Sequence, residues 1–230
     1  MLLAILALAL AHPSLARAQV GASVTLQSDY RYRGYTLSDR KTALAVNIAY
    51  DHASGLYAGG SAFAADTDLR GVRVLGEVAY AGYATRTGAG PSLDMGVSRS
   101  RFISYRGRKR AVEFTEVYAG LAGNHLSARV AYSPKYVGQE VETLYVDLSA
   151  AYRPAPDWRL FAHAGALIPL SGRSYPVGRR KRYDVTVGAA RRIKACEVSV
   201  YVTSTSPALI YPNGQRAERS ALVVSASYFF

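Results

Sequence analysis

The chain has little of three features that would indicate a class of protein directly: cysteine, long apolar runs and metal-binding clusters. Of its 230 residues one is cysteine, Cys196, so no intramolecular disulfide can form. After the N-terminal residues no stretch of about 18 apolar residues occurs, which excludes a membrane protein built from helices. The four histidines do not join Asp or Glu at metal-ligand spacing, and no glycine-rich phosphate loop precedes a helix. We therefore expect neither a metal nor another cofactor.

The first residues, 1–18, are typical of a secretory signal peptide. An apolar run leads to Pro13, and the small-residue pattern Ala16-Arg17-Ala18 fits a cleavage site. No Lys or Arg precedes the run, so either the true translation start lies upstream or the export signal is weak. The run is too short to cross about 30 Å of hydrocarbon as a helix. We expect a mature protein of one domain, residues 19–230, with no linker that divides it.

Acidic residues and phenylalanine are also scarce. The chain has 16 acidic and 28 basic residues, which gives a net charge of +12, and it has 6 Phe but 18 Tyr. In a cytosolic protein such a charge would point to nucleic acid, but the export signal argues against that partner. Abundant tyrosine is instead typical of a protein that crosses a lipid–water interface.

Apolar and polar residues alternate along most of the mature chain. Between Val24 and Arg33 the apolar residues share one face, and the other face carries Thr25, Gln27, Asp29, Arg31 and Arg33. A barrel strand in lipid alternates in this way because one face meets hydrocarbon and the other a wet lumen. A strand of a soluble sandwich gives the same alternation with its apolar face turned inward. The alternation therefore predicts antiparallel strands and does not decide what surrounds them.

The pattern predicts twelve strands, with ten or fourteen as alternatives, since boundaries drawn in this way are imprecise. An even number suits a single-chain bacterial barrel whose two ends lie on one side of the membrane. After the first, the predicted strands cover about residues 42–50, 56–65, 72–80, 93–97, 112–121, 126–133, 143–152, 158–167, 183–187, 198–203 and 220–230.

The connections between these strands sort by length. One set is short and turn-like, as at residues 51–55 and 122–124, and the alternate set is longer and basic, as at 34–41 and 103–111. Outer-membrane barrels have short periplasmic turns and longer outer loops, whereas a sandwich has no reason to sort its loops by parity. This asymmetry favours an all-β transmembrane antiparallel barrel of about 12 strands, in the outer membrane of a Gram-negative bacterium.

The C-terminus supports the same fold. The chain ends in Tyr228-Phe229-Phe230, and Tyr228 and Phe230 fall on the apolar face of the last predicted strand. Terminal aromatic residues on the lipid face would anchor the closing strand at the periplasmic interface. Such an ending resembles the signal that the barrel-assembly machinery recognises. An ordinary edge strand that ends the chain is the alternative.

The first predicted hairpin resembles a known family. Residues 28–34 read SDYRYRG, Leu37-Ser38-Asp39 follows, and residues 49–59 read AYDHASGLYAG. This pattern is similar to that of the TorF family of porin-like outer-membrane proteins, in which Phe is usual at the position of Tyr32. The resemblance is specific over about residues 28–59 and weaker beyond them. It implies a porin-like barrel and no particular substrate.

By strict alternation, charges of both signs face the predicted lumen. Facing rows of opposite charge would set the field in a narrow pore and select solutes, or would pair across the lumen and plug it. A barrel of this size lies between filled eight-stranded barrels and open sixteen-stranded porins. We expect the lumen to be lined by Asp29, Arg31, Arg33, Arg73, Glu77, Arg129, Asp147 and Asp184.

Two predicted outer loops carry clusters of basic residues. Arginine binds phosphate bidentately, so these clusters are candidates to contact lipopolysaccharide. They would equally raise the local concentration of anionic solutes at the mouth, or be solvated loops with lipid contacts. The residues are Arg106, Arg108, Lys109, Arg110, Arg179, Arg180, Lys181 and Arg182.

The sequence therefore predicts a porin that forms a narrow channel for small solutes, with anions as the candidate class. A non-conducting structural or lipopolysaccharide-binding barrel is the alternative, and a lipid-modifying enzyme has less support. Barrel lipid hydrolases use a Ser–His pair on the outer wall, and of the histidines only His163 lies on a predicted strand, with no nucleophile motif beside it. We expect no enzyme. The expected partners are outer-membrane lipid, lipopolysaccharide, the barrel-assembly machinery and small solutes, with no nucleic acid.

Overall fold

The computed structural model describes residues 19–67, 71–86, 88, 90–103, 111–138, 141–171, 181–206 and 219–230. In these ranges the barrel strands are β1 (Gln19–Gln27), β4 (Ala43–Asp51), β5 (Leu56–Thr67), β6 (Gly71–Arg86), β7 (Ser92–Phe102), β8 (Val112–Ala122), β9 (Leu126–Ser133), β10 (Thr143–Ala155), β11 (Trp158–Pro169), β12 (Arg182–Ile193), β13 (Cys196–Ser206) and β14 (Ser220–Phe229). A two-stranded sheet, β2 (Arg31–Tyr32) and β3 (Tyr35–Thr36), lies between β1 and β4, and a short 3-10 turn, η1 (Tyr136–Gly138), follows β9.

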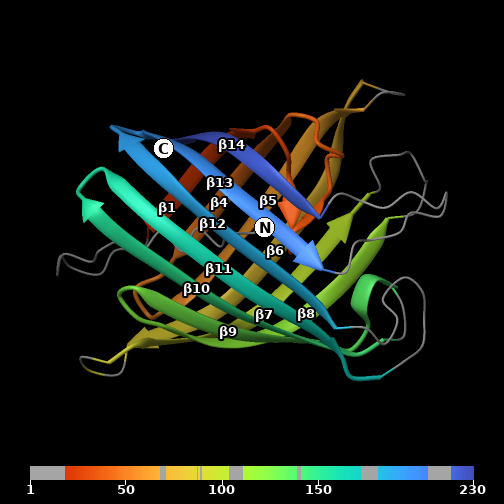
Figure 1. Cartoon of the computed structure of the whole chain (residues 1–230). Coiled ribbons are helices and arrows are strands. Elements are labelled where there is room, and N and C mark those ends of the chain that lie inside the picture. The colour runs from red at the N-terminus through yellow and green to blue at the C-terminus, as the bar shows by residue number, and fades with distance from the viewer. Residues whose placement is uncertain are drawn as a thin grey trace.

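The strands form one closed antiparallel sheet (Figure 1). Each pairs with its neighbour in sequence, and β1 closes the barrel by pairing with both β14 and β4. The prediction of a twelve-stranded antiparallel barrel is thereby confirmed. The signal peptide lies outside the described residues and stays a prediction.

Alternate side chains of each strand face away from the lumen, and most of these are apolar. Val187 on β12 is 64% exposed and Leu222 on β14 is 65% exposed. Apolar surface of this extent is rare on proteins surrounded by water, so the belt is suited to hydrocarbon. The apolar face of the alternation therefore points outward, which excludes the sandwich interpretation. Among the described residues, no helix is long and apolar enough to span a bilayer.

The two ends of the barrel differ as the loop lengths predict. Short turns join β4 to β5, β8 to β9, β10 to β11 and β12 to β13 at one end (Figure 1). The connections of the opposite end are longer, except that three residues join β5 to β6. The start of β1 and the end of β14 share the short-turn end. Outward tyrosines gather near it, as in the interfacial girdle of outer-membrane barrels, where this end is periplasmic. They are Tyr50, Tyr83, Tyr152 and Tyr228.

One β-bulge changes the direction of the side chains in β6. The register between β5 and β6 shifts beside Phe63, and Leu75 and Gly76 both turn inward. Beyond the bulge, Val78 is buried and the side chain of Glu77 is 55% exposed on the outer face. The expectation that Glu77 lines the lumen is therefore wrong, because the extra residue of a bulge reverses the alternation that follows it.

Candidate functional site: a hairpin folded into the lumen

Residues 28–42, which connect β1 to β4, fold into the barrel and are called the inward hairpin below. Strand β1 ends at Gln27, so the predicted first strand, which ran to Arg33, is too long. Ser28 still bonds to the backbone of Val224 on β14, and the chain then turns inward. Arg31 is 2% exposed, so the side chains that were expected on a strand wall belong to a compact insert inside the barrel.

The tip of the inward hairpin is a tight turn at Arg33 and Gly34. Both residues have positive φ, 48° and 75°, as in the type I′ turn of two-residue hairpins. A Cβ at position 34 would lie 2.7 Å from the Cβ of Thr205 and 3.1 Å from that of Asp184. Glycine is therefore required here twice, by the backbone conformation and by close contact with the wall formed by β12 and β13.

The carboxylate of Asp29 holds the inward hairpin together. Its Oδ1 accepts hydrogen bonds from the hydroxyls of Thr36, at 2.6 Å, and Ser38, at 3.2 Å. Its Oδ2 accepts from Arg31 Nε at 2.6 Å, and Arg31 Nη1 donates to the carbonyl of Gly34 at 2.8 Å. Asp29 and Arg31 thus lie inside the lumen, but they belong to the inward hairpin and bond to the hairpin itself instead of lining the wall.

Arg33 anchors the tip to the far wall. Its Nη2 lies 2.8 Å from both carboxylate oxygens of Glu116 on β8, and its guanidinium stands 3.8 Å from the ring centroid of Tyr145 on β10. Burial disfavours the charge of Arg33, but the field of the Glu116 carboxylate outweighs it and raises the pKa of the guanidinium. Arg33 therefore stays charged, and its ion pair with Glu116 joins the tip of the inward hairpin to the barrel wall at β8.

Aromatic contacts complete the attachment of the inward hairpin. The ring of Tyr30 stacks on Phe63 of β5, with centroids 3.7 Å apart. Tyr32 packs against Phe102 of β7 at 5.0 Å and against Phe114 of β8 at 6.2 Å. The hairpin therefore contacts β5, β7, β8, β10, β12 and β13, and so crosses the lumen from wall to wall.

A second polar group spans part of the lumen below the inward hairpin, toward the short-turn end. Arg129 on β9 donates to Asp94 on β7 at 2.7 Å and stacks over the ring of Tyr118 on β8. Tyr57 on β5 donates to the same carboxylate and contacts the hydroxyl of Tyr118 at 2.7 Å. The structure places Arg129 in the lumen and adds Asp94, which lies between the apolar Leu93 and Met95 and so was accessible from the same alternation.

A third group lies beside the hairpin tip. Asp184 is 5% exposed and accepts from the hydroxyl of Tyr145, while His163 Nε2 lies 3.0 Å from its Oδ1. The other ring nitrogen of His163 lies 3.0 Å from the hydroxyl of Ser149. His163 faces the lumen and not the lipid, so it does not have the outer-wall position of a barrel lipid hydrolase. Arg73 and Asp147 also lie on the inward face, away from these bonds.

The cavity between the inward hairpin and the short-turn end has a volume of about 360 Å³ and is called the vestibule. Small polar side chains and aromatic rings line it, together with the ion pair of Arg159 and Glu197. Its polar lining includes Thr25, Gln27, Asn47, Ser127, Ser149, Ser199, Ser225 and Ser227. This lining suits water and hydroxylated solutes more than apolar ligands.

Most of the basic loop residues lie outside the described residues: Arg106, Arg108, Lys109, Arg110, Arg179 and Arg180. Lys181 is exposed, and Arg182 begins β12 with its guanidinium 5.6 Å from the ring of Tyr35 in the inward hairpin. Tyr228 and Phe230 point outward at the short-turn end, with ring centroids 4.9 Å apart. Their role as an assembly signal stays a prediction.

Known proteins share this architecture. A model of the Gcw_chp family, described as a bacterial protein of unknown function, matches residues 13–225, and the name TorF is not confirmed. No curated protein matches the chain in sequence. The KdgM porin is 14% identical, with a TM-score of 0.55 over 93% of this chain and 99% of that one. The NanC porin is 8% identical, with a TM-score of 0.59 over 91% and 99%. The translocator domain of the autotransporter NalP from Neisseria meningitidis is 15% identical, with a TM-score of 0.50 over 95% and 90%. At these identities the likeness shows a barrel fold shared with outer-membrane proteins.

Proposed function

The chain belongs to the Gcw_chp family of bacterial proteins of unknown function, and we propose that it is an outer-membrane channel narrowed by its inward hairpin. The solutes we propose are small, hydrophilic and preferably anionic. The porin-like barrel that the comparisons support is the frame of this proposal.

The observation that carries the proposal is the way in which the inward hairpin is attached. It crosses the lumen and contacts the wall through the ion pair of Arg33 with Glu116 and through separate aromatic contacts. Its covalent connections to the barrel are to β1 and β4. A segment held to the wall by side-chain contacts can shift without unfolding the barrel, because the barrel's stability comes from its closed ladder of backbone bonds. The vestibule then gives a solute a polar path on the short-turn side.

The preference for anions rests on charge near the opposite end of the lumen. There Arg73 points inward from β6, Arg182 lies at the start of β12, and Lys181 is exposed beside it. Deeper in the lumen Arg33 pairs with Glu116 and Arg129 pairs with Asp94, and the carboxylates of Asp147 and Asp184 also face inward. Basic side chains at the mouth raise the local concentration of anions that can enter the lumen.

A non-conducting structural barrel is the second candidate, and one observation favours it. Asp29 and Arg31 are buried and bonded to each other, which gives the inward hairpin a well-packed interior of its own. A plug as ordered as this would keep the barrel closed. An enzyme has less support, because the backbone N–H groups around Ser149 belong to the ladders with β9 and β11, so no oxyanion site is assembled beside that hydroxyl.

Single-channel conductance of the refolded barrel in a planar bilayer tests the proposal. We expect discrete open steps, with a reversal potential in a salt gradient that indicates anion preference. A variant whose residues 29–41 are replaced by a short Gly/Ser linker should conduct more in each open step. Silence from both proteins, shown to be folded by their heat-dependent migration on gels, would overturn the channel. Conduction by the linker variant alone would favour the permanent plug.

A further inference from the structure

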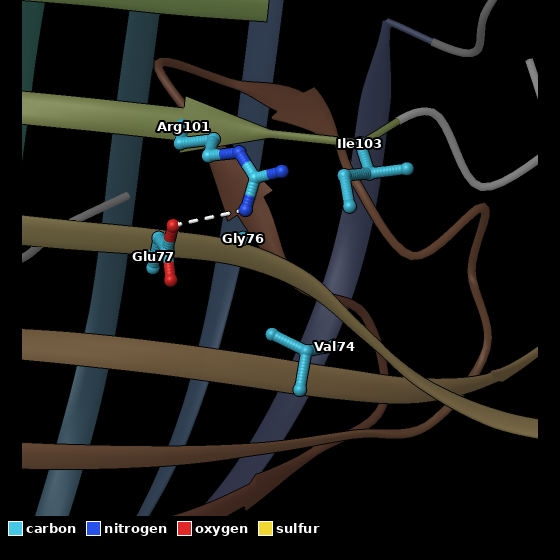
Figure 2. A pocket seen from close by; sticks show the side chains of 5 residues that line it. All are labelled: Val74, Gly76, Glu77, Arg101 and Ile103. Carbon is cyan, nitrogen blue, oxygen red and sulfur yellow. Dashed lines mark hydrogen bonds and ion pairs between the residues drawn. The ribbon is translucent and has the colours of Figure 1, made fainter. Parts of the chain in front are cut away.

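The bulge in β6 leaves a hollow in the outer wall of the barrel. Because Leu75 and Gly76 both face inward, no side chain of β6 points outward between Val74 and Glu77. The hollow has a volume of about 290 Å³ and is lined by Val74, Gly76, Glu77, Arg101 and Ile103 (Figure 2). We call it the outer notch. It opens on the face that the apolar belt turns toward lipid.

A row of charges crosses three strands beside the outer notch. Arg101 on β7 pairs in register with Glu77 on β6 and with Glu113 on β8, and its nitrogens lie 3.2 Å from an oxygen of each. Figure 2 shows the contact with Glu77 at the edge of the hollow. Arg99 lies one outward position nearer the short-turn end, 2.8 Å from Glu113, and its side chain is 70% exposed. All four charged groups therefore stand on the outer wall and not in the lumen.

The row lies at the upper edge of the apolar belt. From the outward Leu93, β7 rises about 20 Å to Arg101, at ~3.3 Å per residue and a strand tilt of ~40°. The apolar band of outer-membrane barrels is about 25 Å tall and is flanked at both interfaces by aromatic girdles. Tyr132 and Tyr183 face outward in the half of the barrel that adjoins the longer connections, as interfacial aromatics do. Charges on a lipid-facing wall are tolerated at this level, where lipid headgroups replace hydrocarbon.

Below the row the outer wall is unusually flat. The outward positions of β5 and β6 between the notch and the short-turn end hold mainly glycine and alanine. These small side chains leave space for acyl chains to lie against the backbone. They are Ala58, Gly60, Ala62, Ala79 and Ala81.

We propose that the outer notch, with Arg99 and Arg101, binds the phosphorylated headgroup of lipopolysaccharide, with the acyl chains on the small-residue wall below. The proposal rests on the outer-membrane placement proposed above. A guanidinium has five N–H donors, and only Nη2 of Arg99 is bonded to a carboxylate among the described residues. Glu77 and Glu113 hold the two arginines in position, and the remaining donors have the planar geometry that phosphate accepts.

Lipid titration of the refolded full-length barrel, read by native mass spectrometry, tests this site. The probes are bisphosphorylated lipid A, dephosphorylated lipid A and phosphatidylglycerol. The test variant is R99Q/R101Q. The matched control is R191Q, which removes an outward arginine that is also ion-paired, with Asp157, at the short-turn end. A second test variant, V74W, fills the notch and keeps every charge.

We expect R99Q/R101Q to bind lipid A at least about tenfold more weakly than the wild type, since charge-assisted bonds to phosphate are lost. V74W should weaken binding as well, R191Q should not, and dephosphorylated lipid A should bind the wild type as weakly as lipid A binds R99Q/R101Q. Equal affinity of wild type and R99Q/R101Q would overturn the site. Equal affinity of the wild type for phosphatidylglycerol and for lipid A would overturn the choice of lipopolysaccharide.

These residues do not reach the lumen, so the conductance of R99Q/R101Q should match that of the wild type. Failure of the lipid site and failure of the channel are therefore separate results.

Discussion

Arg33 and Glu116 lie 83 positions apart in the sequence and meet through a bidentate contact, with one guanidinium nitrogen 2.8 Å from each carboxylate oxygen. The contact joins the tip of the inward hairpin to β8, and both side chains are at most 10% exposed. A substitution that removes the charge of either residue should therefore change the position of the inward hairpin and the conductance of the lumen.

We expect Glu116→Gln to release the inward hairpin. Loss of one partner leaves Arg33 buried without its counter-charge, which costs roughly 3 kcal/mol in comparable sites. The hairpin should therefore leave the lumen more often, and the open probability in a planar bilayer should rise. Glu113→Gln is the matched control, because Glu113 lies on the same strand with its side chain on the outer wall. An equal effect of both variants would contradict the anchor.

Asp29→Asn should loosen the inward hairpin from within. The amide keeps the shape but gives up the ion pair with Arg31 and one of the acceptors for Thr36 and Ser38. The buried arginine is then uncompensated, and the hairpin should open locally while the barrel stays closed. Trypsin should cut the folded variant in residues 31–41 well before it cuts the wild type. Asp157→Asn, in an exposed turn at the other end, should leave the digestion pattern unchanged.

Gly34→Ala should push the tip of the inward hairpin away from β12 and β13. The positive φ by itself costs about 1 kcal/mol for alanine, and the added methyl would also lie 2.7 Å from Thr205 Cβ. Gly88→Ala separates the two causes, because Gly88 has a φ of +58° and nothing within 4 Å of a Cβ. Hydrogen exchange of residues 28–42 should accelerate in the first variant alone. Equal behaviour would mean that contact with the wall does not hold the tip.

Arg73→Gln should shift the ion selectivity of the open channel toward cations. Arg73 points inward from β6 near the long-connection end, where its charge acts on ions that enter the lumen. The reversal potential in a salt gradient should move accordingly, and the shift should shrink as salt screens the charge. Arg101→Gln, on the outer wall of the adjacent strand, is the control. An unchanged reversal potential for Arg73→Gln would remove this residue from the conduction path.

The approximate number of strands, and which side chains of a strand share one face, could be predicted from the sequence because both depend on local alternation. Val185 and Val187 face outward and Asp184 and Thr186 face inward, as the period of two predicts. Where the backbone departs from that period, the prediction fails. The bulge beside Gly76 places Glu77 on the outer wall. The residues around it carry no sequence pattern that predicts the bulge.

Residues 28–33 show the same limit inside the barrel. Their alternation continues that of β1, yet they form the inward hairpin, because Asp29 finds its partners at Thr36 and Ser38 and not in a strand ladder. Ser28, Gly34 and Ser38 of the inward hairpin indicate a turn, but not that the turn folds inward.

The sequence by itself determined the antiparallel strands, and the parity of the loop lengths favoured a membrane barrel of about twelve of them, which the closed sheet confirms. These properties follow from the alternation of side chains within each strand and from the length and composition of each connection, which are local in sequence. The tertiary structure decided that a hairpin crosses the lumen and that four charges stand on the outer wall. Those features depend on contacts between strands far apart in the chain, and such contacts exist only once the barrel has closed.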